Sequence, residues 1–193
     1  ILDAPRATLE TVPGIGPKLA NAIVEESRTI DIAAEIHLAK EKDVQIIPYT
    51  SEQYPKHLKA IYDPPLVLYV KGNILEADIL ALAIVGARRC TYYGLSQAER
   101  FGRLLAQKGL CIVSGMARGI DAAAHRGAIG SRGRTIAVLG CGLGVMYPRE
   151  NIELAEQIVQ HGAIVSEFPM NTPPDFRNFP PRNRLISGLS LGV

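Results

Sequence analysis

The spacing of hydrophobic and polar positions changes twice along this chain. Up to residue 45, apolar side chains recur at helical spacing, first at 19–24, after a Pro-Gly-Ile-Gly-Pro turn, and again at 31–42. This spacing predicts a small helical domain over residues 1–45. Residues 46–65 are rich in proline, tyrosine and polar side chains and lack a period, which predicts a linker or lid.

The segment 66–193 alternates short apolar runs with stretches of helical spacing. The runs predict strands at 66–70, 82–85, 110–113, 136–139 and 163–165, and the intervening stretches predict helices through 98–105, 121–129 and 151–160. Such strands are typical of a parallel sheet that helices cover on both faces. We therefore expect an α/β fold, a Rossmann-like, mostly parallel sheet preceded by the helical domain. Because the final Leu-Gly-Val resembles the start of a strand, we expect a sheet truncated at the C-terminus.

The composition is that of a globular protein of the cytoplasm. The chain has 193 residues, 47% hydrophobic and 21% charged, and no uncharged apolar run approaches the roughly 18 residues that a membrane helix needs. The three cysteines, Cys90, Cys111 and Cys141, form no CxxC motif, and the four histidines are scattered. The sequence thus predicts a protein of a reducing compartment, with no disulfide framework, metal, cofactor or membrane contact.

The charge is distributed unevenly, although the net charge is only +2. Residues 1–62 hold seven Lys and Arg against nine Asp and Glu, whereas residues 63–193 hold fourteen against ten, and twelve of those fourteen are arginines. Arginine is favoured where a phosphate or carboxylate is bound in a bidentate manner. An anion-binding site is therefore expected in the arginine-rich segment.

The most informative stretch, SGMARGIDAAAHRGA, begins at Ser114. A predicted strand delivers Ser114 and Gly115 to its end. Arg118 and Gly119 then precede a predicted helix, so backbone amides and a guanidinium group can surround an anion. Arg88 follows the neighbouring strand in the same way, and the carboxyl ends of parallel strands meet at one edge of a sheet. We expect one shared phosphate pocket; a helix N-cap beside an incidental arginine is the alternative.

A second stretch, DFRNFPPRNRLIS, occupies residues 175–187. It interleaves basic, amide and aromatic side chains, namely Arg177, Arg182, Arg184, Asn183, Phe176 and Phe179. This combination suits single-stranded nucleic acid, because phosphates require charge and unpaired bases require a flat ring. We expect a proline-stiffened loop in which Phe179 stacks on a base and Phe176 fills the core. Packing of both rings in the core is the alternative.

The helical domain carries one further candidate site. Gly14 and Gly16 give the VPGIGPKLA segment the form of a helix-hairpin-helix turn, in which amides at a helix N-terminus face a DNA phosphate and Lys18 adds charge. The acidic balance of the domain and the lack of a second such hairpin favour a turn that serves only packing. Both interpretations stay open.

Catalytic motifs are weak by comparison. Ser114, Asp121 and His125 supply the residue types of a hydrolase triad, but no GxSxG elbow surrounds the serine. The glycine-rich segment 140–144 is followed by Val145 where a dinucleotide fingerprint requires its last glycine, and the sequence has no P-loop motif. We therefore expect no catalytic residue and no enzymatic activity.

Several ordered motifs together resemble one known family. They are YPKHLKAIYDPPLVLYVKGN, AIVGARRCTYYG, SGMARGIDAAAHRGAI, TIAVLGCGLGVMYPRENIEL, GAIVSEFP and FPPRNRLISGLSLGV. Over residues 54–193 the chain closely resembles the DNA processing protein A (DprA/Smf) family, and its N-terminus resembles the small helix-hairpin-helix or SAM-like domain of such proteins. The resemblance implies a Rossmann-like domain that binds single-stranded DNA without catalysis, protects incoming strands during natural transformation and helps to load the recombinase RecA.

The resemblance also implies which residues contact DNA. Carried over by motif, the DNA pocket comprises Arg88, Ser114, Gly115, Arg118, Gly119, Phe179, Arg182 and Asn183. Further candidates are Arg177, near a basic position of the family, and Arg184, Gly14, Gly16 and Lys18. Ala87 stands where many relatives have serine, which removes a hydroxyl donor. The family's sheet continues beyond Val193, and a homodimer and the RecA contact are expected mostly there.

Two rival interpretations belong to other functional classes. A nucleotide-processing Rossmann enzyme, such as a phosphoribohydrolase of the lysine-decarboxylase-like group, shares glycine-rich loops at strand ends, but its PGGxGTxxE segment is absent from these residues. A scaffold that binds only protein partners is the other. Release of a free base from nucleoside monophosphates would favour the enzyme, and failure to bind any oligonucleotide at low salt would favour the scaffold.

Overall fold

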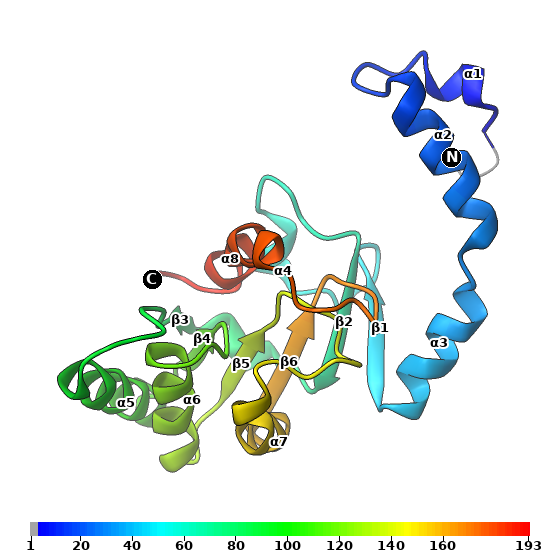
Figure 1. The fold of residues 1–193 in the computed structure, drawn as a ribbon. Coiled ribbons are helices and arrows are strands. Elements are labelled where there is room, and N and C mark those ends of the chain that lie inside the picture. Colours follow the sequence, from blue (N-terminus) through cyan, green and yellow to red (C-terminus); the bar gives the residue numbers. More distant parts are fainter. Residues whose placement is uncertain (1–3) are drawn as a thin grey trace. The chain divides into compact units, whose positions relative to one another are not determined.

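The computed structural model describes residues 4–193 (Figure 1). Contacts between Cα atoms divide the chain into two compact units, one up to residue 36 and one from residue 37 onward. The first unit contains α1, Arg6–Leu9, and α2, Pro17–Thr29, while α3, Ile32–Glu41, includes the division. The two helices predicted near the N-terminus are therefore present.

The segment predicted as a linker is instead part of the folded second unit. Residues Val44–Pro48 form β1, which pairs in antiparallel register with β2, Val67–Gly72. Tyr54 and Leu58, from the same segment, are buried in the core. The prediction of a linker at 46–65 is wrong because β1 is short and ends at a proline, so the local sequence does not indicate a strand. The strand forms only by pairing with β2, which is distant in the sequence.

The sheet has six strands in the order β1-β2-β6-β5-β4-β3. The remaining strands are β3, Ala81–Ala83, β4, Cys111–Ser114, β5, Thr135–Val138, and β6, Gly162–Ser166. β3, β4, β5 and β6 are parallel neighbours, which confirms the expected mostly parallel sheet, whereas β2 runs antiparallel to β6. Only residues 73–80, including a 3-10 turn at Glu76–Ile79, join β2 to β3, too few for the crossover that parallel strands require.

Helices cover both faces of the sheet (Figure 1). On one face lie α5, Tyr92–Gln107, α6, Ile120–Gly130, and α7, Ile152–His161, which a 3-10 turn at Arg149–Asn151 precedes; on the other lie α4, Lys56–Lys59, and α8, Phe179–Gly188. Along β5, Ile136 and Val138 pack on the α4 and α8 side, and Ala137 packs on the α6 and α7 side. Burial on both faces accounts for the uninterrupted apolar runs. No helix among residues 4–193 has the length and apolar character needed to cross a membrane.

The stretch rich in arginine and phenylalanine is helical rather than a loop. A 3-10 turn, Phe176–Asn178, leads into α8. Pro180 and Pro181 lie in the first turn of α8, where a missing amide proton costs no helical hydrogen bond. The loop prediction is wrong because these two prolines begin a helix. Leu185 and Ile186 then attach α8 to the sheet.

Candidate nucleic-acid interface

A pocket of about 160 Å³ lies at the carboxyl ends of the parallel strands. We call it the arginine pocket; its lining is Arg88, Arg89, Gly115, Ala117, Arg118, Leu139, Gly140, Cys141, Tyr147, Pro148, Phe179 and Arg182. The lining includes five residues that the sequence predicted for DNA contact, namely Arg88, Gly115, Arg118, Phe179 and Arg182. Segments that lie far apart in the sequence therefore meet at the predicted edge of the sheet.

The carboxylate of Asp121, at the start of α6, organises the loops beneath this pocket. Its Oδ1 accepts a hydrogen bond from the Gly86 amide at 3.2 Å, and its Oδ2 accepts one from the Ala117 amide at 3.4 Å. Burial raises the pKa of Asp121, and these amides oppose that rise. Both amides are thus directed at an internal carboxylate rather than at a bound phosphate, so the positive charge of the pocket comes from guanidinium groups.

Arg182 forms the buried floor of the pocket and is only 5% exposed. Its Nη1 donates hydrogen bonds to the carbonyl oxygens of Gly115, at 3.0 Å, and Val138, so the side chain ties the ends of β4 and β5 together. Burial lowers the pKa of Arg182, and the Asp121 charge opposes the effect. A Cβ at Gly115 would lie 2.6 Å from Arg182 Nη2, so only glycine permits this approach. The main role of Arg182 is therefore structural.

Arg88 and Phe179 form the aromatic side of the pocket. The Arg88 guanidinium carbon lies 4.7 Å from the centroid of the Phe179 ring, and the Tyr147 ring stacks on the same phenylalanine at 6.0 Å. Phe179 is half-buried against Gly140, where a Cβ would lie 2.8 Å from the ring. Phe176, in contrast, is 78% exposed, so the expectation that it fills the core is wrong. The 3-10 turn carries Phe176 outward and the first turn of α8 carries Phe179 inward.

Arg118 stands on the exposed rim of the pocket, just before α6. Its Nη2 forms an ion pair with Glu150 Oε1, and both side chains are more than half exposed. An exposed ion pair of this kind is weak, so a phosphate can compete with the carboxylate for Arg118.

Ser114, Gly119 and Asn183 support the pocket without lining it. The Ser114 hydroxyl is fully buried and donates to the Ile84 carbonyl oxygen at 2.6 Å. Gly119 has φ of 80°, and a Cβ there would overlap the Ala87 carbonyl oxygen, so a side chain would displace the Arg88 loop. Asn183 is exposed on α8, and its Oδ1 accepts from Arg182 Nε at 3.2 Å. The structure thus gives Ser114 and Gly119 positioning roles.

The two additional arginines near α8 differ from each other. Arg177 is exposed and pairs with Asp175, with 2.6 Å between Nη2 and Oδ2, a contact that lowers the pKa of Asp175 to about 2. Arg184 is half-buried and is held by Glu167, with 2.6 Å between Nη2 and Oε2, and by Asp63. Arg184 therefore joins α8 to the rest of the unit, whereas Arg177 stays accessible.

The glycine turn of the first unit has the predicted geometry. Gly14 adopts a left-handed φ of 90°, Gly16 caps α2, and Lys18 is exposed in the first turn of that helix. A Cβ at either glycine would meet no atom within 4 Å, so the turn is open to its surroundings. Contact of this turn with DNA stays a prediction.

The residue types of a hydrolase triad do not assemble. The Ser114 hydroxyl donates to a backbone carbonyl, Asp121 accepts from backbone amides, and His125 Nδ1 lies 2.6 Å from Thr135 Oγ1. Within residues 4–193, no group of three histidine, cysteine or acidic side chains is arranged to hold a metal ion.

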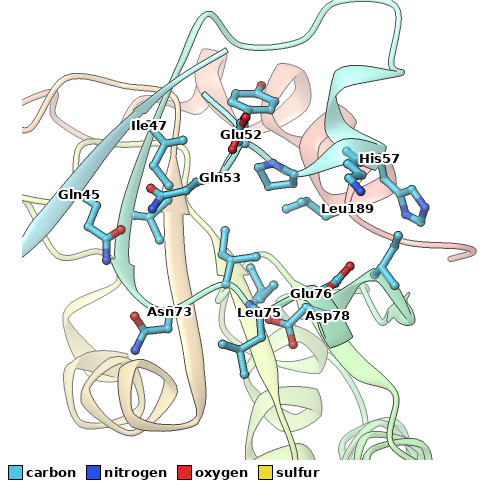
Figure 2. A pocket seen from close by; sticks show the side chains of 17 residues that line it. Gln45, Ile47, Glu52, Gln53, His57, Asn73, Leu75, Glu76, Asp78 and Leu189 are labelled. Carbon is cyan, nitrogen blue, oxygen red and sulfur yellow. Dashed lines mark hydrogen bonds between the residues drawn. The ribbon is translucent and has the colours of Figure 1, made fainter. Parts of the chain in front are cut away.

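A larger cavity, about 570 Å³, lies on the face of the sheet that carries α4 and α8 (Figure 2). Its polar lining includes Glu52, Glu76 and Asp78, and Asp78 is paired with Arg134 at 2.7 Å between Oδ2 and Nη2. Arg134 neutralises Asp78, and the carboxylates of Glu52 and Glu76 outnumber the single lysine of the lining, Lys56, so the lining offers a phosphate backbone no excess of positive charge. The smaller arginine pocket is therefore the better candidate for an anion, in spite of its size.

Sequence reasoning missed Arg89, Tyr147 and Glu150. Arg89 directly follows a predicted residue, so its position was a usable signal. Tyr147 and Glu150 lie in the long connection after β5, and nothing local in the sequence places them beside Phe179 and Arg118.

The fold is therefore that of an α/β protein with a Rossmann-like sheet, whose carboxyl edge presents guanidinium groups beside an aromatic ring. The family model described as DNA recombination-mediator protein A matches residues 45–193, and the chain belongs to this family. It is 44% identical over 155 residues to the DNA processing protein DprA of Bacillus subtilis (strain 168), a match that covers 80% of this chain and 52% of that protein. The chain spans about half the length of the curated relatives it matches.

Two solved structures share the fold. DNA processing protein A from Streptococcus pneumoniae superposes with a TM-score of 0.77 at 35% identity, covering 97% of this chain and 65% of that one. DNA processing protein A from Helicobacter pylori, described for its single-stranded DNA binding mode, has a TM-score of 0.68 at 35% identity, covering 76% of this chain and 66% of that one. Both confirm the Rossmann-like fold.

Proposed function

We propose that the arginine pocket binds single-stranded DNA without catalysing a reaction on it. The observation that carries this proposal is that two exposed arginines, Arg88 and Arg118, line one pocket together with the half-buried Phe179 ring. Guanidinium groups recognise phosphates, and an aromatic ring provides a surface for an unpaired base. The single-stranded DNA binding of the Helicobacter pylori relative supports the same assignment.

The geometry favours a single strand over a duplex. The arginine pocket is a concave site of about 160 Å³, and its aromatic ring lies inside the pocket rather than on a protruding element. A duplex is read by elements that enter its grooves, whereas a base reaches a recessed ring only when it is unstacked. The backbone of an unpaired strand can then remain on the rim.

The contact between Arg88 and Phe179 couples the two halves of this recognition. The guanidinium occupies one surface of the ring at 4.7 Å, so a base that stacks there displaces it. The displaced Arg88 is then available to the adjacent phosphate. Base stacking and phosphate binding at this site are therefore expected to depend on each other.

We also propose that the whole protein acts in the processing of incoming DNA strands during natural transformation, in the cytoplasm, with RecA as a partner. The family membership and the name of the Bacillus subtilis relative support this role. RecA contact and homodimer formation are proposed mostly for regions beyond Val193, and Gly14, Gly16, Lys18 and Arg177 are proposed as accessory DNA contacts.

The test is a salt titration of full-length protein with single- and double-stranded oligonucleotides. Arg88→Ala and Arg118→Ala should each weaken binding to single strands of any sequence. Each should also reduce the salt slope, which is the slope of log affinity against log salt concentration, by about 0.7. Arg132→Ala, which removes an exposed arginine beyond the C-terminal end of α6, is the matched control. Unchanged binding in both pocket variants contradicts the assignment, and release of a free base from a nucleoside monophosphate contradicts the absence of catalysis.

A further inference from the structure

A second basic hollow, of about 460 Å³, lies between α5 and α6. We call it the α5–α6 groove, and its polar and aromatic lining is Tyr92, Ser96, Glu99, Arg100, Arg103 and Arg126. The two helices approach closely because Gly127 faces the Glu99 carbonyl oxygen and Gly102 faces that of Ala124, where a Cβ would overlap. The long side chains therefore rise on both sides of a narrow seam.

The chemistry of this groove matches a polyanion with flat bases. It has three arginines against one carboxylate, and that carboxylate, Glu99, is already paired with Arg103 at 3.1 Å. Tyr92 is 87% exposed at the end of the groove where α5 begins. Cations beside an exposed ring are the elements that single-stranded nucleic acid requires, whereas an apolar protein segment would find few apolar groups here.

Both helices of the groove begin just after segments that line the arginine pocket. Arg88 and Arg89 of the pocket lie directly before the Thr91 cap of α5, and Arg118 lies directly before α6. The starts of the two helices touch, because a Cβ at Gly94 would lie 3.4 Å from Ile120 Cδ1. A strand that leaves the rim of the pocket over these helix starts therefore enters the groove.

We propose that the α5–α6 groove is an extension of the DNA site, in which Arg103 and Arg126 hold phosphates and Tyr92 stacks on a base. This inference rests on the proposed function of the arginine pocket. The inference predicts that affinity depends on strand length, because only a strand longer than the arginine pocket can reach the groove.

The test compares the affinity of full-length protein for oligothymidylates of about 6 and about 20 nucleotides. In Arg103→Ala/Arg126→Ala protein, affinity for the longer strand should fall about three- to ten-fold, and its salt slope should decrease by about 1.4. Affinity for the shorter strand should stay unchanged. The matched control is Lys108→Ala/Arg132→Ala, which removes two exposed charges at the other ends of the same helices.

Variants of Tyr92 distinguish the contribution of base stacking from that of charge. Tyr92→Ala should weaken binding of the longer strand about five-fold or more, and Tyr92→Phe should restore it, while both keep the thermal unfolding temperature. Unchanged affinity for the longer strand, an equal loss for both lengths, or an equal loss in the control overturns the extension. If the wild-type protein does not bind the shorter strand, or if Arg88→Ala does not weaken that binding, it is the proposed function that fails.

Discussion

Arg182 and Arg118 lie at the same edge of the sheet, in two motifs that look equally suited to bind phosphate. Arg182, together with Asp121 and Ser114, forms a buried floor in which each polar group has an internal partner. Arg118, together with Arg88, forms an exposed rim whose partners are a surface carboxylate and a ring. Burial and internal bonding, not residue type, separate the groups that hold the pocket from the groups that are available to a ligand.

Removal of the buried floor should have the largest effect. Arg182→Ala leaves the carbonyl oxygens of Gly115 and Val138 without a donor and the Asp121 carboxylate without its counter-charge. We expect a loss of about 3–5 kcal/mol in the free energy of unfolding, measured by urea denaturation. Arg177→Ala, an exposed arginine beside the same helix, should change it by less than about 0.5 kcal/mol. Similar stability in both variants would contradict the distinction between floor and rim.

Acidification should have the next largest effect, through a buried group outside the floor. His125 is buried on α6, and burial lowers its pKa to about 3 from an ordinary 6.5. The unfolded chain binds this proton as the pH falls below 6.5 and the folded chain does not, so stability present at higher pH is lost on acidification. We expect a loss of about 2 kcal/mol in the free energy of unfolding between pH 6.5 and about 5.

His125→Leu removes this titration and should flatten the profile in the same pH range, although its stability at neutral pH is lower. Thr135 Oγ1, which donates to the Ile112 carbonyl oxygen and faces His125 Nδ1, loses one partner in that variant. A wild-type profile that is already flat between these pH values would show that the buried ring takes up a proton in the folded state.

The two phenylalanines near α8 test which aromatic ring stacks on a base. Phe179→Ala should weaken the binding free energy for single-stranded DNA by about 1–2 kcal/mol. This value is in the lower part of the range for base stacking, because Arg88 has to leave the ring before a base can stack on it. Phe176→Ala should have a smaller effect, because Phe176 does not line the arginine pocket. Fluorescence anisotropy with a short oligothymidylate measures both. The reverse order would transfer the stacking role to the exposed ring.

The smallest effect is expected at Glu150. Glu150→Gln removes the carboxylate that pairs with Arg118, and single-strand affinity should rise about two-fold at low salt. Glu153→Gln, an equal charge change on the exposed side of α7, is the control. A decrease in affinity would indicate that Glu150 orients Arg118 for the phosphate instead of competing with it.

Much of the fold was predictable because its signals are local. The parallel strands are buried on both faces and appear as apolar runs, and the helices between them show their own period. The strand β1 and the antiparallel direction of β2 were not predictable in this way. Strand pairing depends on residues distant in sequence, such as Val44 with Lys71 and Val70 with Val165.

The sequence by itself determined the class of the sheet, the strand ends that carry arginines and the candidate ligand chemistry, since periodicity, glycine and arginine are local properties. The tertiary structure decided which arginines are exposed. Arg182 is buried because its partners Gly115 and Val138 lie 67 and 44 residues away, at strand ends that converge only in the folded sheet. Arg118 stays accessible because its ion pair with Glu150 lies in solvent. Desolvation is a property of all neighbours together, and only the folded chain supplies them.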